Sequence, residues 1–114
     1  MPSTVLDRLL RPLLRGPSTR AYPTRPLEVP DAARGLPELD TGRCDATAAC
    51  VTVCPTGAIG VTGDAWQLDA GRCVFCAACV TTCPQDAIRM SARMELATRS
   101  RQSLLVIDDI RRSP

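Results

Sequence analysis

The sequence predicts a small α+β domain with pseudo-twofold symmetry, flanked by extended N- and C-terminal arms. Three observations lead to this prediction. A 21-residue unit occurs twice without gaps, at 39–59 and 68–88, and 14 of its positions are identical in the two copies. All seven cysteines lie between Cys44 and Cys83. Seven of the ten prolines lie in the first 37 residues, where they oppose regular packed structure.

The length of 114 residues allows one domain, and the three aromatic residues leave little material for a hydrophobic core. Composition and repeat divide the chain into four expected parts. These are an amphipathic helix (1–16), a Pro-rich extended arm (17–37), the repeat domain (38–91) and a C-terminal arm (92–114). The simpler alternative for the Pro-rich arm is a disordered linker.

The first segment shows the spacing of an amphipathic helix. Leucines recur at i, i+3, i+4, i+7 and i+8, which gathers them on one face; they are Leu6, Leu9, Leu10, Leu13 and Leu14. Thr4 and Asp7 form a capping-box pattern, whereas Pro12 is expected to kink or shorten the helix. So short a helix needs a surface to fold against, which is a membrane interface, a partner subunit or the protein's own domain.

Each copy of the repeat predicts a short helix followed by a strand. The expected helices lie at 48–53 and 77–82, and Pro55 and Pro84 end them because proline lacks the N–H group. Strands are expected at 59–61 and 88–90, and 65–68 is expected to be a partner strand that leads into the second copy. The symmetry of the repeat predicts the pseudo-twofold arrangement of these elements.

Charge and cysteine usage limit the possible functions. The segments 1–43 and 91–114 each carry a net charge of +2, whereas 44–90 carries −2, which gives little support for nucleic-acid binding. An odd number of cysteines at i, i+3 spacing, without the features of a secretory signal, argues against a disulfide framework. The expected environment is therefore reducing and cytoplasmic. No apolar stretch reaches the ~18 residues of a membrane span.

The second copy carries a specific metal-binding motif. Its cysteines follow the pattern C-x2-C-x2-C-x3-C-P, from Cys73 to Cys83, which is the iron–sulfur run of bacterial two-cluster ferredoxins. Three thiolates on one tight loop can hold three corners of a cubane, and the fourth points to a different cluster. A structural zinc site is the alternative, but zinc takes four tetrahedral ligands, usually as two separated pairs. The motif therefore predicts a dicluster ferredoxin-like domain.

The first copy departs from this motif because Thr47 stands where the second cysteine is expected. Crossed ligation assigns a complete set of ligands to one 4Fe–4S cluster, namely Cys73, Cys76, Cys79 and Cys54. The other cluster then has only Cys44, Cys50 and Cys83. Thr47, Asp45 or water would hold the fourth iron weakly, so a 3Fe–4S cluster or an incompletely ligated 4Fe–4S cluster is expected there. A third possibility is that this site binds no cluster.

The chain resembles a known family, the ferredoxin-like subunit of membrane-bound group 4 nickel–iron hydrogenases and formate hydrogenlyases. That subunit is homologous to the chain I subunit of respiratory complex I. The resemblance covers roughly residues 20–98. Besides the cysteines, it rests on Tyr22-Pro23 followed by Arg34-Gly35, on Gly71-Arg72-Cys73-Val74-Phe75-Cys76, and on Met94-Glu95-Leu96-Ala97.

The resemblance implies an electron-transfer subunit that relays electrons through two iron–sulfur clusters within a hydrogenase or complex I-like assembly. The implied partners are the subunit with the proximal cluster and a membrane subunit contacted by the N-terminal helix, on the cytoplasmic face of the cell membrane. The alternative is a free soluble dicluster ferredoxin, and a redox sensor is more distant. Histidine is absent and no nucleophile–base pair is visible, so no catalysis by the chain itself is expected.

Overall fold

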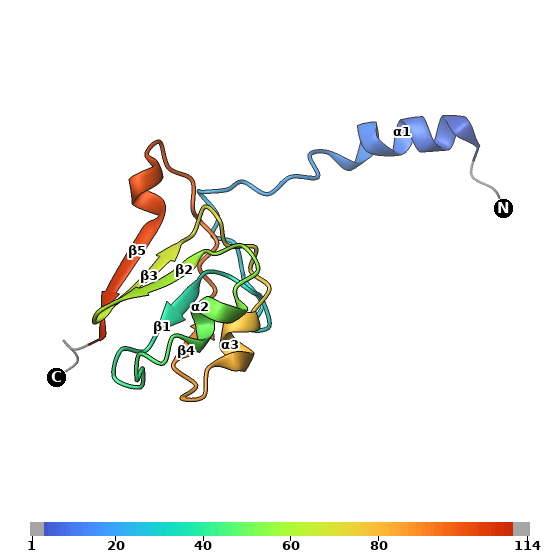
Figure 1. The fold of residues 1–114 in the computed structure, drawn as a ribbon. Coiled ribbons are helices and arrows are strands. Elements are labelled where there is room, and N and C mark those ends of the chain that lie inside the picture. The colour runs from blue at the N-terminus through green and yellow to red at the C-terminus, as the bar shows by residue number, and fades with distance from the viewer. Residues whose placement is uncertain (1–3, 111–114) are drawn as a thin grey trace.

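A computed structural model describes residues 4–110; those parts of the expected helix and C-terminal arm that fall on 1–3 and 111–114 lie outside it. In this range the chain forms helices, strands and one 3-10 turn, with long irregular segments on both sides of the repeats (Figure 1). The elements are α1 (Val5–Arg15), β1 (Pro37–Leu39), α2 (Ala49–Val53), β2 (Ile59–Thr62), β3 (Ala65–Asp69), α3 (Ala78–Thr82), β4 (Ile88–Met90), η1 (Arg101–Leu104) and β5 (Leu105–Asp109).

The strands form two antiparallel sheets. β1 pairs with β4, so the lead-in to the first repeat lies beside the end of the second. β2 and β3 form a hairpin, and β5 pairs with the other edge of β3. The hairpin places Val61 opposite Trp66 and Ile59 opposite Leu68, so these pairs share faces of the sheet.

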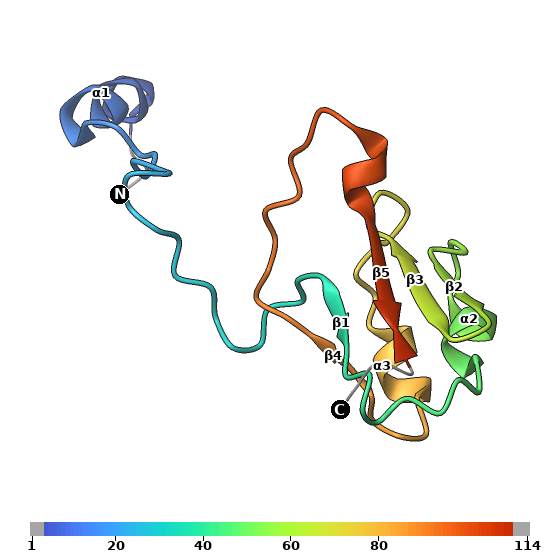
Figure 2. The same cartoon turned by 90° about the vertical axis from the view of Figure 1, so that its left-hand side faces the viewer.

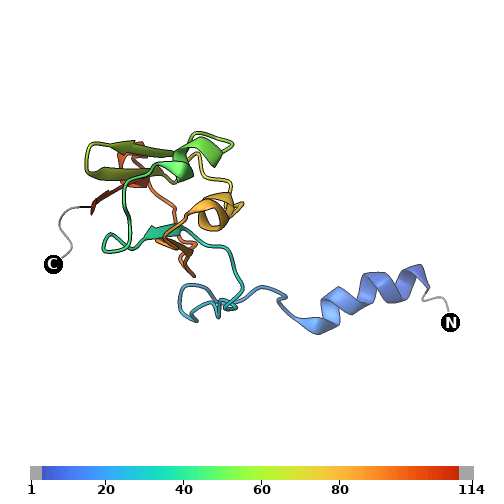
Figure 3. The same cartoon turned by 60° about the horizontal axis from the view of Figure 1, so that its bottom comes forward.

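The two repeats fold alike, as their sequence identity predicts. α2 and α3 occupy equivalent positions, and each follows a residue in the left-handed conformation, Ala48 or Ala77. Each helix is followed by a cysteine and then a proline, which cannot supply the next N–H group. The helices pack against each other at one end of the sheets, where they are drawn green and orange in Figure 3. The result is the expected α+β domain with pseudo-twofold symmetry.

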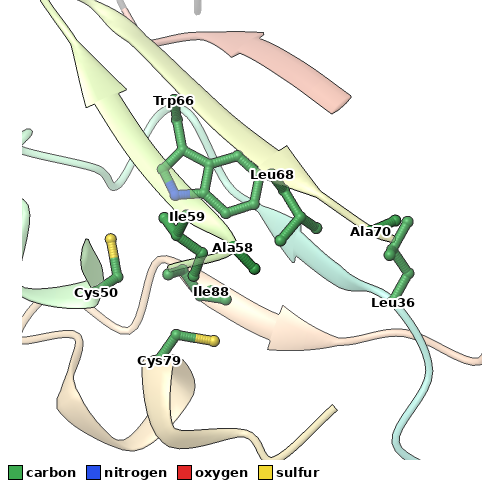
Figure 4. Close-up of a cluster of buried hydrophobic side chains, with 9 residues drawn as sticks. All are labelled: Leu36, Cys50, Ala58, Ile59, Trp66, Leu68, Ala70, Cys79 and Ile88. Atoms are coloured by element: carbon green, nitrogen blue, oxygen red, sulfur yellow. The ribbon is translucent and has the colours of Figure 1, made fainter. Parts of the chain in front are cut away.

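The core lies between the two sheets and the helix pair. Its largest fully buried side chains are Trp66, Leu36 and Leu68. Cys50 and Cys79, from the first turns of α2 and α3, belong to the same buried cluster, as Figure 4 shows. Because two sulfur atoms take part in so small a core, the hydrophobic core and the cysteine sites are one unit rather than separate features.

The C-terminal segment folds back onto the repeat domain, a course that the sequence alone did not predict. It leaves β4, runs beside the domain and returns through η1 into β5 (Figure 2). Arg101 forms an ion pair of 2.8 Å with Asp69, which also accepts a hydrogen bond from the Gly71 N–H. The apolar run 104–107 is the sequence signal for this strand, and β5 makes the hairpin a three-stranded sheet.

The two arms meet where they leave the domain. Gly35 N–H donates to the Ser91 carbonyl at 2.9 Å, and Leu36 N–H donates to the Arg93 carbonyl at 2.7 Å. Farther out, the Tyr22 hydroxyl hydrogen-bonds to Glu95, which raises the pKa of Tyr22. A Cβ on residue 35 would lie 2.3 Å from the Ser91 carbonyl oxygen, so only glycine allows the backbones to approach this closely.

Gly35→Ala is therefore expected to force the two arms apart. All three atoms nearest to the added Cβ belong to the backbone of Ser91 and Arg93, and overpacking of this kind costs about 1–3 kcal/mol. Thermal unfolding of the anaerobically prepared protein should show a midpoint below that of the wild type, by about 4–8 °C for each kcal/mol lost in a domain of this size. Gly60→Ala is the matched control, because nothing lies within 4 Å of its added Cβ. Equal midpoints for the two variants would contradict the close approach.

α1 stands apart from the domain at the end of the Pro-rich arm (Figure 1). It continues through Pro12 to Arg15, so the proline does not shorten it, and Thr4 begins the helix without a side-chain hydrogen bond. The expected capping box is therefore wrong, since Asp7 instead pairs with Arg11 at 3.2 Å. None of the helix residues is buried, and the described molecule measures 64 × 31 × 24 Å. Within residues 4–110, every helix lacks the length or the apolar character required to cross a bilayer.

Candidate metal centres

One cavity gathers the four cysteines that crossed ligation assigns to the complete site. Cys73, Cys76 and Cys79 come from the second repeat, and Cys54 comes from the first. The cavity has a volume of about 20 Å³ and is otherwise lined mainly by apolar residues. We call it the Cys76 cavity. The structure thus brings together thiols from distant parts of the chain, as the motif predicts.

A second cavity gathers the remaining three cysteines. Cys44 and Cys50 come from the first repeat, Cys83 comes from the second, and Thr47 and Asp45 complete the same loop. Its volume, about 20 Å³, equals that of the Cys76 cavity. We call it the Thr47 cavity. The exchange of cysteine for threonine has therefore not collapsed the site.

The helix pair explains why each cavity draws on both repeats. Cys50 lies in the first turn of α2 and faces the Thr47 cavity, whereas Cys54 follows the last turn and faces the Cys76 cavity. α3 does the same in reverse with Cys79 and Cys83. Each short helix therefore joins one cavity to the other through two cysteines one turn apart.

The cysteine-bearing loops have the same unusual backbone in both repeats. Phe75 and Ala77, on either side of Cys76, have positive φ angles of 55° and 65°. Ala46 and Ala48, on either side of Thr47, have φ angles of 59° and 58°. This conformation is rare for residues other than glycine, especially for a bulky phenylalanine, and such strain concentrates at functional sites. The first loop therefore has the same backbone conformation as the second despite Thr47.

Backbone N–H groups donate to the cysteine sulfurs in a repeated pattern. Ala58 N–H lies 3.3 Å from Cys54 Sγ, and the equivalent Ala87 N–H lies 3.4 Å from Cys83 Sγ. In the second loop, Phe75 N–H lies 3.4 Å from Cys73 Sγ. Burial acts to raise the pKa of Cys54, but the N–H groups around it outweigh burial and lower that pKa. These donors favour the thiolate, which is the form that binds metal.

The innermost thiols show the opposite shift. Burial raises the pKa of Cys79 to about 11 and also raises the pKa of Cys50 and of Cys73. For Cys50 the net change in pKa is upward, although the nearby indole of Trp66 acts in the opposite direction. A buried thiol of this kind releases its proton readily only when a bound cation stabilises the negative charge of the thiolate.

Position 47 lies at the solvent side of its cavity. Thr47 is exposed, and so is Cys76 at the equivalent position of the other repeat. Asp45, the nearest carboxylate in the loop, accepts the Thr47 N–H at 3.2 Å and the Gln85 side-chain amide at 3.0 Å. The Thr47 N–H is the first cause, and Gln85 the second, of the lowered pKa of Asp45. Both carboxylate oxygens are thus engaged within the loop.

The residues fit iron–sulfur clusters by their chemistry. All seven thiols are free of disulfide bonds, and each cavity combines thiols with nearby N–H donors. Over the described range 4–110, no three Cys, Asp or Glu side chains converge closely enough to hold one metal ion. The thiols line the two cavities. Thiolates on the walls of such cavities are the ligands of clusters, and N–H donors to sulfur adjust their reduction potentials.

The residues predicted from the sequence, all seven cysteines and Thr47, lie in the two cavities, but the N–H donors of Ala58 and Ala87 were not predicted. The signal for them was present, because Ala-Ile follows the Cys-Pro turn in both copies. Nor was Trp66 predicted as a polar neighbour of Cys50, since a single tryptophan in a strand is usually a core residue.

Comparisons with known proteins agree with this geometry. Residues 43–87 match the family described as the 4Fe-4S dicluster domain. The chain is 45% identical over 96 residues to formate hydrogenlyase subunit 6 of Escherichia coli (strain K12), an alignment that covers 79% of this chain and 53% of that protein. It also superimposes on a chain of the membrane-bound sulfane sulfur reductase, an archaeal respiratory membrane complex. There the TM-score is 0.71 at 32% identity, over 90% of this chain and 59% of that one. The chain thus spans little more than half the length of these relatives.

Proposed function

We propose that the chain is an electron-transfer subunit of a membrane-associated hydrogenase or complex I-like oxidoreductase, because it is similar to formate hydrogenlyase subunit 6 and its residues 43–87 match the 4Fe–4S dicluster domain. The observation that carries the proposal is the pair of cavities, each lined by cysteines from both repeats. Iron–sulfur clusters bound there would accept and pass on single electrons.

We assign the ligands by cavity. Cys54, Cys73, Cys76 and Cys79 hold a 4Fe–4S cluster in the Cys76 cavity. Cys44, Cys50 and Cys83 hold the second cluster in the Thr47 cavity, where Thr47 stands in place of the fourth cysteine. Asp45 is engaged by Thr47 and Gln85. We therefore propose a 3Fe–4S cluster, or a 4Fe–4S cluster whose fourth iron is open to water at the exposed position 47.

The residues of this chain would hold the two clusters, exclude water from them and connect one cavity to the other. α2 and α3 fix the cysteine pairs that lead from one cavity to the other, and the buried core excludes water from Cys50 and Cys79. The described residues contain neither histidine nor a nucleophile paired with a base, so we assign the catalytic step of the complex to other subunits.

We propose that each of the four parts of the chain has a separate role. The domain at 38–91 carries the clusters, the arms at 17–37 and 92–114 lie along neighbouring subunits, and the helix in 1–16 contacts a membrane subunit. The complex would sit on the cytoplasmic face of the cell membrane, with the subunit that carries the proximal cluster as the other partner. α1 supports this role because its leucines are exposed and it lies away from the domain.

Replacing both Leu9 and Leu13 by glutamate should release the chain from its complex. The two side chains are 64% and 78% exposed here, and burying one leucine against a partner contributes about 1.5–3 kcal/mol. We expect co-purification with the membrane fraction to fall more than about tenfold, with the cluster spectra unchanged. Arg8→Gln on the other face is the control and should leave association near the wild-type level. Undiminished association of the leucine variant would remove the helix from the interface.

Purification of the tagged chain from its native membranes tests the proposed function. Co-elution with hydrogenase-like and membrane subunits, in fixed stoichiometry and through high salt, is the expected result. A cluster-loaded monomer that binds partners only transiently would instead identify a free dicluster ferredoxin and contradict the proposal.

A further inference from the structure

Trp66 carries a polar atom that the fold leaves without a partner. The side chain is fully buried, at 0% exposure. Its Nε1 is the one buried side-chain nitrogen or oxygen in the described part of the chain that lacks a hydrogen bond. Leaving such a donor unsatisfied costs about 1–3 kcal/mol, so a buried N–H group in a native protein usually has an acceptor.

The orphaned N–H lies next to the Thr47 cavity. Trp66 pairs across the hairpin with Val61, which lines that cavity, so both side chains lie on the same face of the sheet. Figure 4 shows the indole nitrogen on the edge of the ring that faces Cys50. The N–H group therefore approaches the cavity from behind one of its three cysteines. In this structure no hydrogen bond yet joins the indole N–H to the Cys50 sulfur.

A neutral thiol is a weak acceptor, whereas a thiolate that bears negative charge is a strong one. Cys50 becomes such a thiolate when it ligates iron. We propose that the Trp66 N–H donates a hydrogen bond to the Cys50 sulfur of the cluster-loaded protein, which makes Trp66 a positioning residue that sets the reduction potential of the Thr47-cavity cluster. The inference rests on the proposed function, because it needs a cluster in that cavity.

The arrangement is specific to one of the two clusters. Cys79 is the equivalent of Cys50 in the second repeat, and the groups that act on it are backbone N–H groups and other cysteines. The repeat offers no second tryptophan, because the chain contains only one. A hydrogen bond to sulfur stabilises the reduced cluster, which carries one more negative charge, and so raises its potential. Trp66 therefore raises the potential of the Thr47-cavity cluster relative to its partner.

The test replaces Trp66 in the full cluster-loaded chain by benzothienylalanine, which keeps the shape of the ring but has no N–H group; Trp66→Phe is the genetic equivalent. At a fixed solution potential near the wild-type midpoint, electron paramagnetic resonance should show the reduced-to-oxidised ratio of the Thr47-cavity cluster about three- to tenfold lower. The Cys76-cavity cluster is the internal control and should not change. A purely structural role for the ring predicts no change with benzothienylalanine.

A measurement on the wild type decides the question if a variant does not load. The single tryptophan can be labelled with ¹⁵N at the indole, and its exchangeable proton should show hyperfine coupling to the paramagnetic cluster of the Thr47 cavity. No coupling, or coupling to the other cluster only, overturns the inference while the proposed function stands. Absence of iron from the Thr47 cavity of wild-type protein overturns the proposed function and the inference with it.

Discussion

Replacing Cys54 by serine is expected to destroy or destabilise the cluster bound mainly by the other repeat. Cys54 follows α2 of the first repeat, but its sulfur faces the cavity of Cys73, Cys76 and Cys79. Loss of one of four thiolates from that cavity should cost up to about four iron atoms per chain, or leave a cluster with altered potential and spectrum. The cluster of the Thr47 cavity should keep its iron, because none of its ligands has changed.

Cys83→Ser is the matched reciprocal variant, since Cys83 follows α3 and faces the Thr47 cavity. Iron analysis and electron paramagnetic resonance of both variants, prepared anaerobically, should show opposite clusters affected. Crossed ligation is wrong if Cys54→Ser perturbs only the cluster that contains Cys44 and Cys50.

Thr47→Cys is expected to convert the odd cluster into an ordinary one. The φ angles of Ala46 and Ala48 match those of Phe75 and Ala77 around Cys76, so a cysteine at position 47 receives the backbone that already presents a ligand in the other repeat. Oxidised wild-type protein should show a three-iron signal, or a four-iron cluster with one exchangeable corner. In the variant that signal should disappear, and about one iron atom per chain should be gained or held more tightly.

The same substitution should lower the potential of this cluster. A fourth thiolate adds negative charge around the iron and disfavours the reduced state. Thr52→Cys is the control, because it adds an exposed thiol on α2 that does not line either cavity. Two indistinguishable, fully ligated four-iron clusters already present in the wild type would mean that another group supplies the fourth ligand.

The repeat domain could be predicted closely because its local and long-range signals agree. The helices expected at 48–53 and 77–82 form as Ala49–Val53 and Ala78–Thr82, since the proline after Cys54 and after Cys83 lacks the N–H group that would continue each helix. The expected strands at 59–61, 65–68 and 88–90 form with at most one further residue each. Their alternation and the turn between the first two suffice to specify the hairpin.

The remaining parts depend on contacts that no local pattern specifies. β1 forms because residues 37–39 meet β4, and β5 forms because the chain returns to the free edge of β3. Such returns are set by distant partners rather than by propensity. The course of α1 through Pro12 shows that one proline removes a hydrogen bond without ending a helix held by its neighbouring turns.

Some features of the candidate site could likewise be predicted from the sequence, and others could not. The crossed grouping of the cysteines is expected from the spacing, because three of them share one tight loop and the fourth is displaced by a helical turn toward the other cavity. The sequence does not predict the left-handed backbone at Phe75 or the hydrogen bond that the Gln85 amide donates to Asp45. The first depends on strain that the surrounding fold must support, and the second on a contact between residues 40 positions apart.

The central claim is that one chain holds two iron–sulfur clusters in two cavities built from both repeats. Iron, acid-labile sulfide and zinc analysis of anaerobically prepared wild-type protein tests it most directly. The expected result is about seven or eight iron atoms per chain with a matching amount of sulfide, seven for one three-iron and one four-iron cluster and eight for two four-iron clusters. Zinc in the cysteine sites, or fewer than about six iron atoms per chain, would contradict the claim.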